Sequence, residues 1–305
     1  NKEDSFAVPF VVWAKQNNVH YDFFAISYYP HINKQNELDL AHVYHHDIAP
    51  IQHHQDFRPN ASFEIHEFKF ISTMLRAGFV SVATSHASSF FAMFSKMMLE
   101  NNISEVFQWG NQSNGNYRPD AMTQLALHSM IGNQHFKSQT LGQSQIRHNE
   151  VAAIFSQNSS HSRFDTLLYN FNKNNFTYQQ AESVRVAYKV KHAVGTSFKY
   201  RIGKINRFNN IEDQFYAQFP RSQALEKDGG WRVEKIHQSA STNKLLNNVG
   251  QQVFKQNQGK YGKHNSLNWS EWQQAQVIKN SRGDTVILIN TVIESFGVQK
   301  LEIRI

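Results

Sequence analysis

The sequence predicts an α/β unit followed by an all-β unit. In residues 1–133 helical patterns alternate with short apolar runs, whereas in residues 134–305 strand-like segments follow one another between turns rich in Asn, Ser, Gly and Lys. Hydrophobic residues make up 40% of the chain and charged residues only 18%, which is the composition of a folded protein. We therefore expect two domains with a boundary at residue 133.

The first unit alternates three helix-like and three strand-like segments. Apolar side chains recur at helical spacing in residues 6–16, 89–101 and 118–132. Strand-like runs occupy residues 21–29, 62–68 and 103–109. Pro30 ends the first strand, and Pro119 suits only the first turn of the last helix. Such alternation predicts parallel strands that are joined by helical crossovers.

Simple alternation along residues 62–68 predicts two faces of the second strand. The faces would hold Phe63, Ile65 and Glu67 on one side and Glu64, His66 and Phe68 on the other. Glu67 is therefore expected on the face that carries apolar side chains.

Glu67 is the strongest catalytic candidate, because polar side chains at the carboxyl ends of parallel barrel strands face the catalytic opening. The neighbouring strands place Ser27, Tyr28 and Tyr29 on one side and Gln108 and Trp109 on the other at the same level. A carboxylate framed by a Tyr hydroxyl group and the face of a Trp ring suits a sugar site. The structural alternative is an ion pair between Glu67 and Lys69 at a solvated strand end.

The second unit has the strand spacing of a β-sandwich. The expected strands are residues 150–156, 166–171, 183–190, 197–205 and 285–291. A polar region over residues 209–272 interrupts them, with helical character at residues 211–219 and 269–275. Residues 286–289 and 298–305 resemble a closing hairpin.

The charge pattern argues against nucleic acid or a membrane as a partner. Lys and Arg number 31 against 24 Asp and Glu, for a formal charge of +7, but the basic residues are scattered. Their densest stretch, residues 185–207, alternates with apolar residues as the solvent face of antiparallel strands does. The apolar runs fall far short of the ~20 residues of a transmembrane helix.

No motif predicts a cofactor or a metal site. The chain has no cysteine, no Gly-x-Ser-x-Gly elbow and no glycine-rich phosphate loop. A histidine-rich segment lacks metal-ligand spacing, and we interpret it as a solvated helix and loop. Its members are His42, Tyr44, His45, His46, Asp47, His53 and His54. His86 is expected in the loop after the second strand. There it would lie either at the rim of the Glu67 site or in solvent as an ordinary loop histidine.

The three strand-like runs resemble strands six, seven and eight of clan-A glycoside hydrolase barrels, with family 39 as the best match. The segments are residues 22–30 (DFFAISYYP), 63–68 (FEIHEF) and 107–109 (FQW). The His-Glu-Phe run around Glu67 falls on the strand-seven motif of that family, whose Glu is the nucleophile. Tyr29 matches the Tyr of its His-x-Tyr pair on strand six, whereas Ser27 replaces the His of that pair. His86 resembles a His in the family's loop after strand seven.

The resemblance implies a retaining glycosidase that acts on a polysaccharide or an oligosaccharide. Glu67 would attack the anomeric carbon, and a second carboxyl group about 5–5.5 Å away would serve as acid and base. The substrate-binding residues that it implies are Ser27, Tyr29, His66, His86 and Trp109. In these families the acid/base Glu belongs to an Asn-Glu-Pro motif that ends strand four, and this sequence contains no such motif.

Two functional hypotheses follow. The first is the C-terminal part of a (β/α)8 barrel, strands six to eight, followed by a β-sandwich accessory domain. A whole barrel takes ~250 residues and only residues 1–133 precede the sandwich, so an N-terminal half-barrel segment or chain is the expected partner. The second hypothesis is a non-catalytic carbohydrate-binding or interaction protein derived from a glycosidase. Either protein is expected to be secreted or periplasmic.

Overall fold

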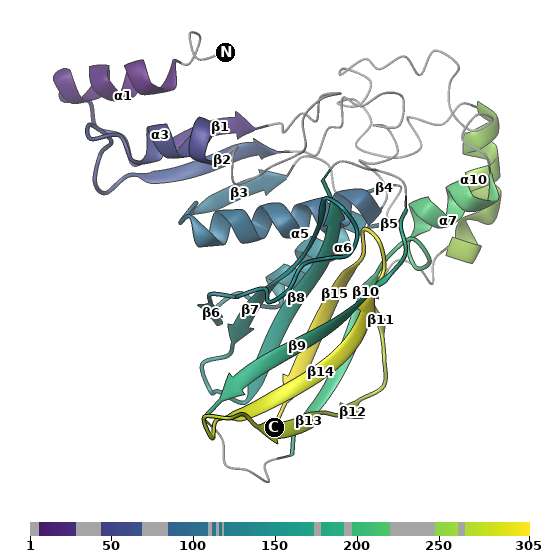
Figure 1. Cartoon of the computed structure of the whole chain (residues 1–305). Helices are drawn as coiled ribbons and strands as arrows, with labels where there is room; N and C mark the ends of the chain where they lie inside the picture. Colours follow the sequence, from purple (N-terminus) through teal and green to yellow (C-terminus); the bar gives the residue numbers. More distant parts are fainter. Residues whose placement is uncertain are drawn as a thin grey trace.

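The chain forms a small parallel sheet with helices on one face, followed by two antiparallel sheets (Figure 1). The computed structural model describes residues 6–28, 44–68, 85–108, 112–113, 116–117, 119–173, 178–191, 197–219, 248–261 and 266–305. No helix within these ranges is long and apolar enough to cross a membrane.

The first unit contains the predicted parallel sheet. Its strands are β1 (Phe23–Tyr28), β2 (Ser62–Phe68) and β3 (Glu105–Gln108). They lie in the order β1-β2-β3, and both neighbouring pairs are parallel, which confirms the crossover prediction. The helices are α1 (Ala7–Gln16), the π-helix η1 (Tyr44–Ile48), α3 (Ala49–Gln52), α5 (Ser85–Glu100) and α6 (Pro119–His128). The short strands β4 (Gln112–Ser113) and β5 (Asn116–Tyr117) pair with each other.

The helices cover one face of the parallel sheet. Phe24 of β1 packs on Phe10 of α1, with ring centroids 5.8 Å apart. Farther along the same face, Tyr28 of β1 and Phe68 of β2 stack on Phe94 of α5, at 6.0 and 4.2 Å. Consecutive parallel strands with their helices on a single face have the arrangement of a sector of a (β/α)8 barrel, whose helices form an outer ring.

A β-bulge in β2 overturns the simple alternation predicted for this strand. Ile26 pairs with Ile65, but the next residue of β1, Ser27, pairs with Glu67, so His66 is the extra residue. Phe68 consequently joins Ile65 in the core on the helical face. Glu67 therefore lies on the same face as His66, opposite to the apolar face that the sequence pattern predicted.

The second unit is built from a seven-stranded and a three-stranded antiparallel sheet (Figure 1). The larger sheet has the order β11-β10-β15-β8-β7-β6, with β12 also pairing with β10, and the smaller sheet has the order β13-β14-β9. The strands are β6 (Gln134–Phe136), β7 (Asn149–Gln157), β8 (Arg163–Asn172), β9 (Glu182–Val190), β10 (Lys199–Ile205), β11 (Asn268–Trp269), β12 (Gln273–Gln274), β13 (Gln276–Lys279), β14 (Thr285–Ile293) and β15 (Val298–Arg304). The five strands predicted at residues 150–156, 166–171, 183–190, 197–205 and 285–291 are confirmed as β7, β8, β9, β10 and β14.

Two predictions for this unit are wrong. Residues 286–289 and 298–305 form no hairpin with each other, because β14 pairs with β9 and β13 whereas β15 pairs with β8 and β10. Residues 269–275 are extended rather than helical. The Trp269 indole lies on Gly203 of β10, where a Cβ atom would be 3.0 Å from the ring, so contacts with a distant strand outweigh the local spacing.

A shared core joins the two units. On the larger sheet, Leu167, Tyr169 and Phe171 of β8 are buried in the same cluster as the apolar side chains of α5. The rings of Phe90 and Phe171 are 5.9 Å apart. Two helices, α7 (Ile211–Gln218) and α10 (Asn248–Tyr261), pack together beside this interface (Figure 1). The sequence pattern predicts α7, but it does not predict α10, whose mean hydropathy is low.

Candidate functional site

The structure brings Glu67 and Ser27 together near the carboxyl ends of β2 and β1. Ser27 Oγ donates a long hydrogen bond of 3.3 Å to Glu67 Oε2. Glu67 is half-buried and Ser27 is exposed. The β-bulge at His66 turns the Glu67 carboxylate toward this hydroxyl group.

The face that carries Glu67 is here called the open face. Its side chains are Phe23, Ala25 and Ser27 of β1, Glu64, His66 and Glu67 of β2, and Glu105 and Phe107 of β3. Phe23 is 49% exposed and Phe107 is 52% exposed, so no described residue covers the large apolar side chains of this face.

His66 is held on the open face by its neighbours on all three strands. Its Nε2 lies 2.6 Å from Glu64 Oε2. Its ring packs against Phe23 at 5.0 Å and against the edge of Phe107 at 5.4 Å. Hydrogen bonds from Ser62 and then His66 outweigh the opposing effect of burial and lower the pKa of Glu64 below its ordinary value. Glu64 thus stays ionised beside the imidazole, and it is a site residue that the sequence pattern did not single out.

His86 does not lie in the predicted loop. It belongs to the first turn of α5 and is 4% exposed, with its ring 4.9 Å from Tyr178 and 4.0 Å from Phe296. The described helix already includes Ser85, four residues before the predicted start, and the backbone N–H of Ser85 donates to Asp213 Oδ2 at 2.9 Å. This contact with α7 could not be found from the local sequence.

The remaining predicted residues are placed as follows. Tyr29, His42 and Trp109 lie outside the described residues. His53 Nε2 lies 3.0 Å from the Tyr44 hydroxyl. Within the described ranges, no three His, Cys, Asp or Glu side chains come together as a metal site would require.

Tyr28 faces away from the candidate site. Its ring stacks on Phe94 of α5, on the helical face. Burial, followed by the negative charge of Asp47, raises the pKa of the Tyr28 phenol far above its ordinary value. The phenol is therefore neutral and belongs to the core.

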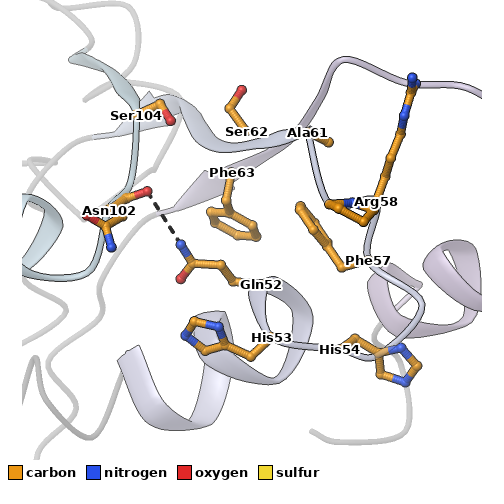
Figure 2. A pocket seen from close by; sticks show the side chains of 11 residues that line it. Gln52, His53, His54, Phe57, Arg58, Ala61, Ser62, Phe63, Asn102 and Ser104 are labelled. Atoms are coloured by element: carbon orange, nitrogen blue, oxygen red, sulfur yellow. Dashed lines mark hydrogen bonds between the residues drawn. The ribbon is translucent and has the colours of Figure 1, made fainter.

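A cavity of about 390 Å³ lies at the amino end of the sheet, away from Glu67. Figure 2 shows Gln52 and His53 of the α3 region on one side and Ser62, at the start of β2, on the other. Five residues of strand, about 16 Å at 3.3 Å per residue, separate Ser62 from Glu67. Gln52 Nε2 donates to the Asn101 carbonyl at 3.0 Å, so the Gln52 amide already has a partner within the protein. The cavity is separate from the Glu67 site.

Comparisons with known proteins give one consistent picture. No protein-family model matches the chain. The α-1,4-L-rhamnosidase of Formosa agariphila is 26% identical over 308 residues, which cover all of this chain and 50% of that protein. The chain thus spans about half the length of the curated relative that it matches.

Solved structures of glycoside hydrolases share the fold. The GH39 enzyme from Xanthomonas axonopodis pv. citri superposes with a TM-score of 0.56 at 12% identity, over 97% of this chain and 57% of that one. A monomeric β-xylosidase from Caulobacter crescentus CB15 gives a TM-score of 0.58 at 9% identity, over 98% and 59% of the two chains. The chain therefore resembles the clan-A glycoside hydrolases, and family 39 in particular, with relatives that are themselves glycosidases.

Proposed function

We propose that this chain is the C-terminal portion of a retaining glycoside hydrolase and that Glu67 is its nucleophile. The main support is the position of the Glu67 carboxylate. The bulge turns it onto the open face near the carboxyl end of β2, where the Ser27 hydroxyl group donates a hydrogen bond to it. Polar groups at this end of parallel barrel strands serve catalysis. The rhamnosidase relative aligns over the entire chain, which supports a glycoside hydrolase function.

In the proposed reaction Glu67 forms a bond to the anomeric carbon as the glycosidic C–O bond breaks. A second carboxyl group gives its proton to the leaving oxygen and then takes a proton from water. That water attacks the anomeric carbon and releases Glu67 from the glycosyl ester. The Ser27 hydroxyl orients the Glu67 carboxylate for the attack.

The second carboxyl group is proposed to come from a further half-barrel, encoded upstream or carried by a partner chain. The described residues supply three parallel strands, whereas a closed barrel has eight. Glu64 is unsuited to the role, because Ser62 and His66 already bind its two carboxylate oxygens. The exposed rings of Phe23 and Phe107 support a barrel that continues across the open face. The three strands would then be strands six to eight.

The proposed substrate class is an oligosaccharide or polysaccharide that contains α-L-rhamnose, because the matching relative is a rhamnosidase. Secretion or a periplasmic location would give access to such a polymer. Ser27, Tyr29 and Trp109 remain the proposed substrate contacts. His86 is an unsuitable contact, because it is buried between the two units.

The test is the activity of the complete protein on 4-nitrophenyl α-L-rhamnopyranoside and 4-nitrophenyl β-D-xylopyranoside, with and without Glu67→Gln. Loss of the nucleophile should lower kcat by at least about 10³-fold on the sugar that is cleaved. Glu271→Gln, at an exposed glutamate of the second unit, is the matched control. Full activity of Glu67→Gln would refute the assignment. Sugar binding by the wild-type protein without turnover would instead favour the non-catalytic carbohydrate-binding protein.

A further inference from the structure

The outer face of the larger sheet, which points away from the smaller sheet, carries three basic side chains in one row. On the inner face, Ile202 and Leu301 belong to the core between the two sheets. On the outer face, Lys199 of β10 pairs in register with Arg304 of β15, which pairs in turn with Arg163 of β8. Side chains that pair in register point to the same face. We call these three side chains the cation row.

The cation row is unfavourable for the sheet by itself. Neighbouring strands lie about 4.8 Å apart, and like charges that face one another across them are destabilising. Lys199 is exposed, and its ammonium group has no hydrogen-bond or ion-pair partner among the described residues. The Arg304 side chain is 53% exposed. An anion that bound along the row would relieve the repulsion.

The carboxylates nearby are too few to neutralise these cations. The next row on the outer face holds Arg201, Glu302 and Asp165, again paired in register. Glu302 accepts hydrogen bonds from one arginine of each row, and Asp165 accepts them from the remaining arginine and from Lys300. With Lys300, the two rows contain five basic and two acidic side chains, a net charge of +3 (5 − 2).

Trp272 lies beside the cation row and restricts its arginine neighbours. The guanidinium groups of Arg201 and Arg304 lie 4.8 and 4.9 Å from the centre of the Trp272 ring. Arg304 binds Glu302 through Nε and Nη2, which leaves its Nη1 group for a ligand. Trp272 itself is 36% exposed. An indole beside cations suits a sugar with an acid group, because the indole packs on the sugar ring and the cations bind the charge.

We propose that the cation row binds an acidic polysaccharide, a polymer whose sugars carry carboxylate or sulfate groups. Exposed cations on three adjacent strands match a series of negative charges along a polymer. Strand β15 runs away from α5 toward the C-terminus (Figure 1), and six residues, about 20 Å at 3.3 Å per residue, separate Arg304 from Val298 in the core shared with α5. The row is thus a second carbohydrate site, which holds the polymer while the Glu67 site cleaves it. The choice of a polysaccharide rests on the proposed function, whereas the anion site does not.

The test is calorimetric binding of the complete protein to polygalacturonate, to dextran sulfate and to uncharged dextran. The two acidic polymers distinguish carboxylate from sulfate as the group that is bound. We expect binding to at least one of them, weakened by added salt, and none to dextran. The double variant Lys199→Gln/Arg304→Gln should raise the Kd about tenfold. Lys255→Gln/Lys260→Gln, at exposed lysines of α10, changes the net charge equally and should raise the Kd less than about twofold.

Three results would overturn the proposal. The first is an equal loss of affinity in the two double variants, which would make net charge the cause. The second is no binding to either acidic polymer, or equal binding to dextran. The third is tighter binding of single-stranded DNA that is lost in the same variant, which would make the ligand a nucleic acid.

Thermal unfolding identifies a double variant that does not fold. In that case Lys199→Gln alone decides, with an expected rise in Kd of about threefold against an unchanged Kd for Lys255→Gln. The row variants should turn over the cleaved nitrophenyl glycoside at the wild-type rate, because the row is remote from Glu67. Wild-type polymer binding by the row variants refutes this inference alone. Full activity of Glu67→Gln refutes the nucleophile assignment and leaves the anion site to be judged by binding.

Discussion

At the scale of single residues, the site depends on contacts between strands that lie 40 residues apart in the chain. The Ser27 hydroxyl is a modest partner for Glu67, because the bond is 3.3 Å long and Ser27 is exposed. Its contribution to orienting the carboxylate should be about 1 kcal/mol.

Ser27→Ala should therefore lower kcat/KM about fivefold, with little effect on the free energy of unfolding. Steady-state kinetics on the cleaved nitrophenyl glycoside measure the change. Ser160→Ala, in the exposed turn after β7, is the control. A Ser27→Ala variant with wild-type kcat/KM would show that the hydroxyl group does not act on Glu67.

At the scale of elements, much of the fold follows from sequence periodicity. The bounds of β2 match the prediction, as do those of α1 and β7 to within a residue or two. Features set by distant contacts could not be predicted. The bulge at His66 depends on pairing with β1, and the Ser85 N–H of α5 donates to Asp213, 128 residues away. For the candidate site, the sequence therefore identified Glu67 and Ser27 but not Glu64.

Asp213 stabilises the first turns of two helices. It accepts a hydrogen bond from the Ser85 N–H of α5, and it exchanges hydrogen bonds with Asn210, the N-cap of α7. Asp213→Ala keeps the backbone N–H that Asn210 Oδ1 caps, but it removes the acceptor of the Ser85 N–H and of the Tyr178 hydroxyl group. It should therefore lower the free energy of unfolding by about 2 kcal/mol. Glu100→Ala, which removes the exposed pair with Lys96, should cost under about 1 kcal/mol. Urea unfolding compares the two variants, and equal losses would contradict this role of the Asp213 carboxylate.

Glu302 makes the stability of the second unit depend on pH. Burial raises the pKa of its carboxyl group, but hydrogen bonds from Arg201 and Arg304 outweigh burial and hold the pKa below its ordinary value of 4.5. The stabilisation is therefore present above pH 4.5 and is lost as the pH falls through the lowered pKa. The difference in Tm between wild type and Glu302→Gln should shrink as the pH is lowered from 6 to 3. A difference that stays constant over this range would contradict the assignment.

At the scale of the whole molecule, the open face is proposed to be the inside of a larger barrel. In the complete protein Phe107 would then be buried, although it is 52% exposed among the described residues. Phe107→Ser should therefore lower the free energy of unfolding of the complete protein by about 2 kcal/mol or more. Leu141→Ser, at a side chain that is 83% exposed, should be nearly neutral. Equal effects in denaturant unfolding would show that nothing covers the open face.

In the proposed mechanism Glu67 forms the covalent bond to the sugar. The most direct measurement is the mass of peptides from the complete protein after reaction with 2-deoxy-2-fluoro-α-L-rhamnosyl fluoride, which traps the glycosyl ester of a retaining rhamnosidase. We expect one added fluorosugar on the peptide that contains Glu67, and none in Glu67→Gln. A label on another carboxylate, such as Glu105, or turnover of the nitrophenyl rhamnoside with no trapped ester at all, would contradict it.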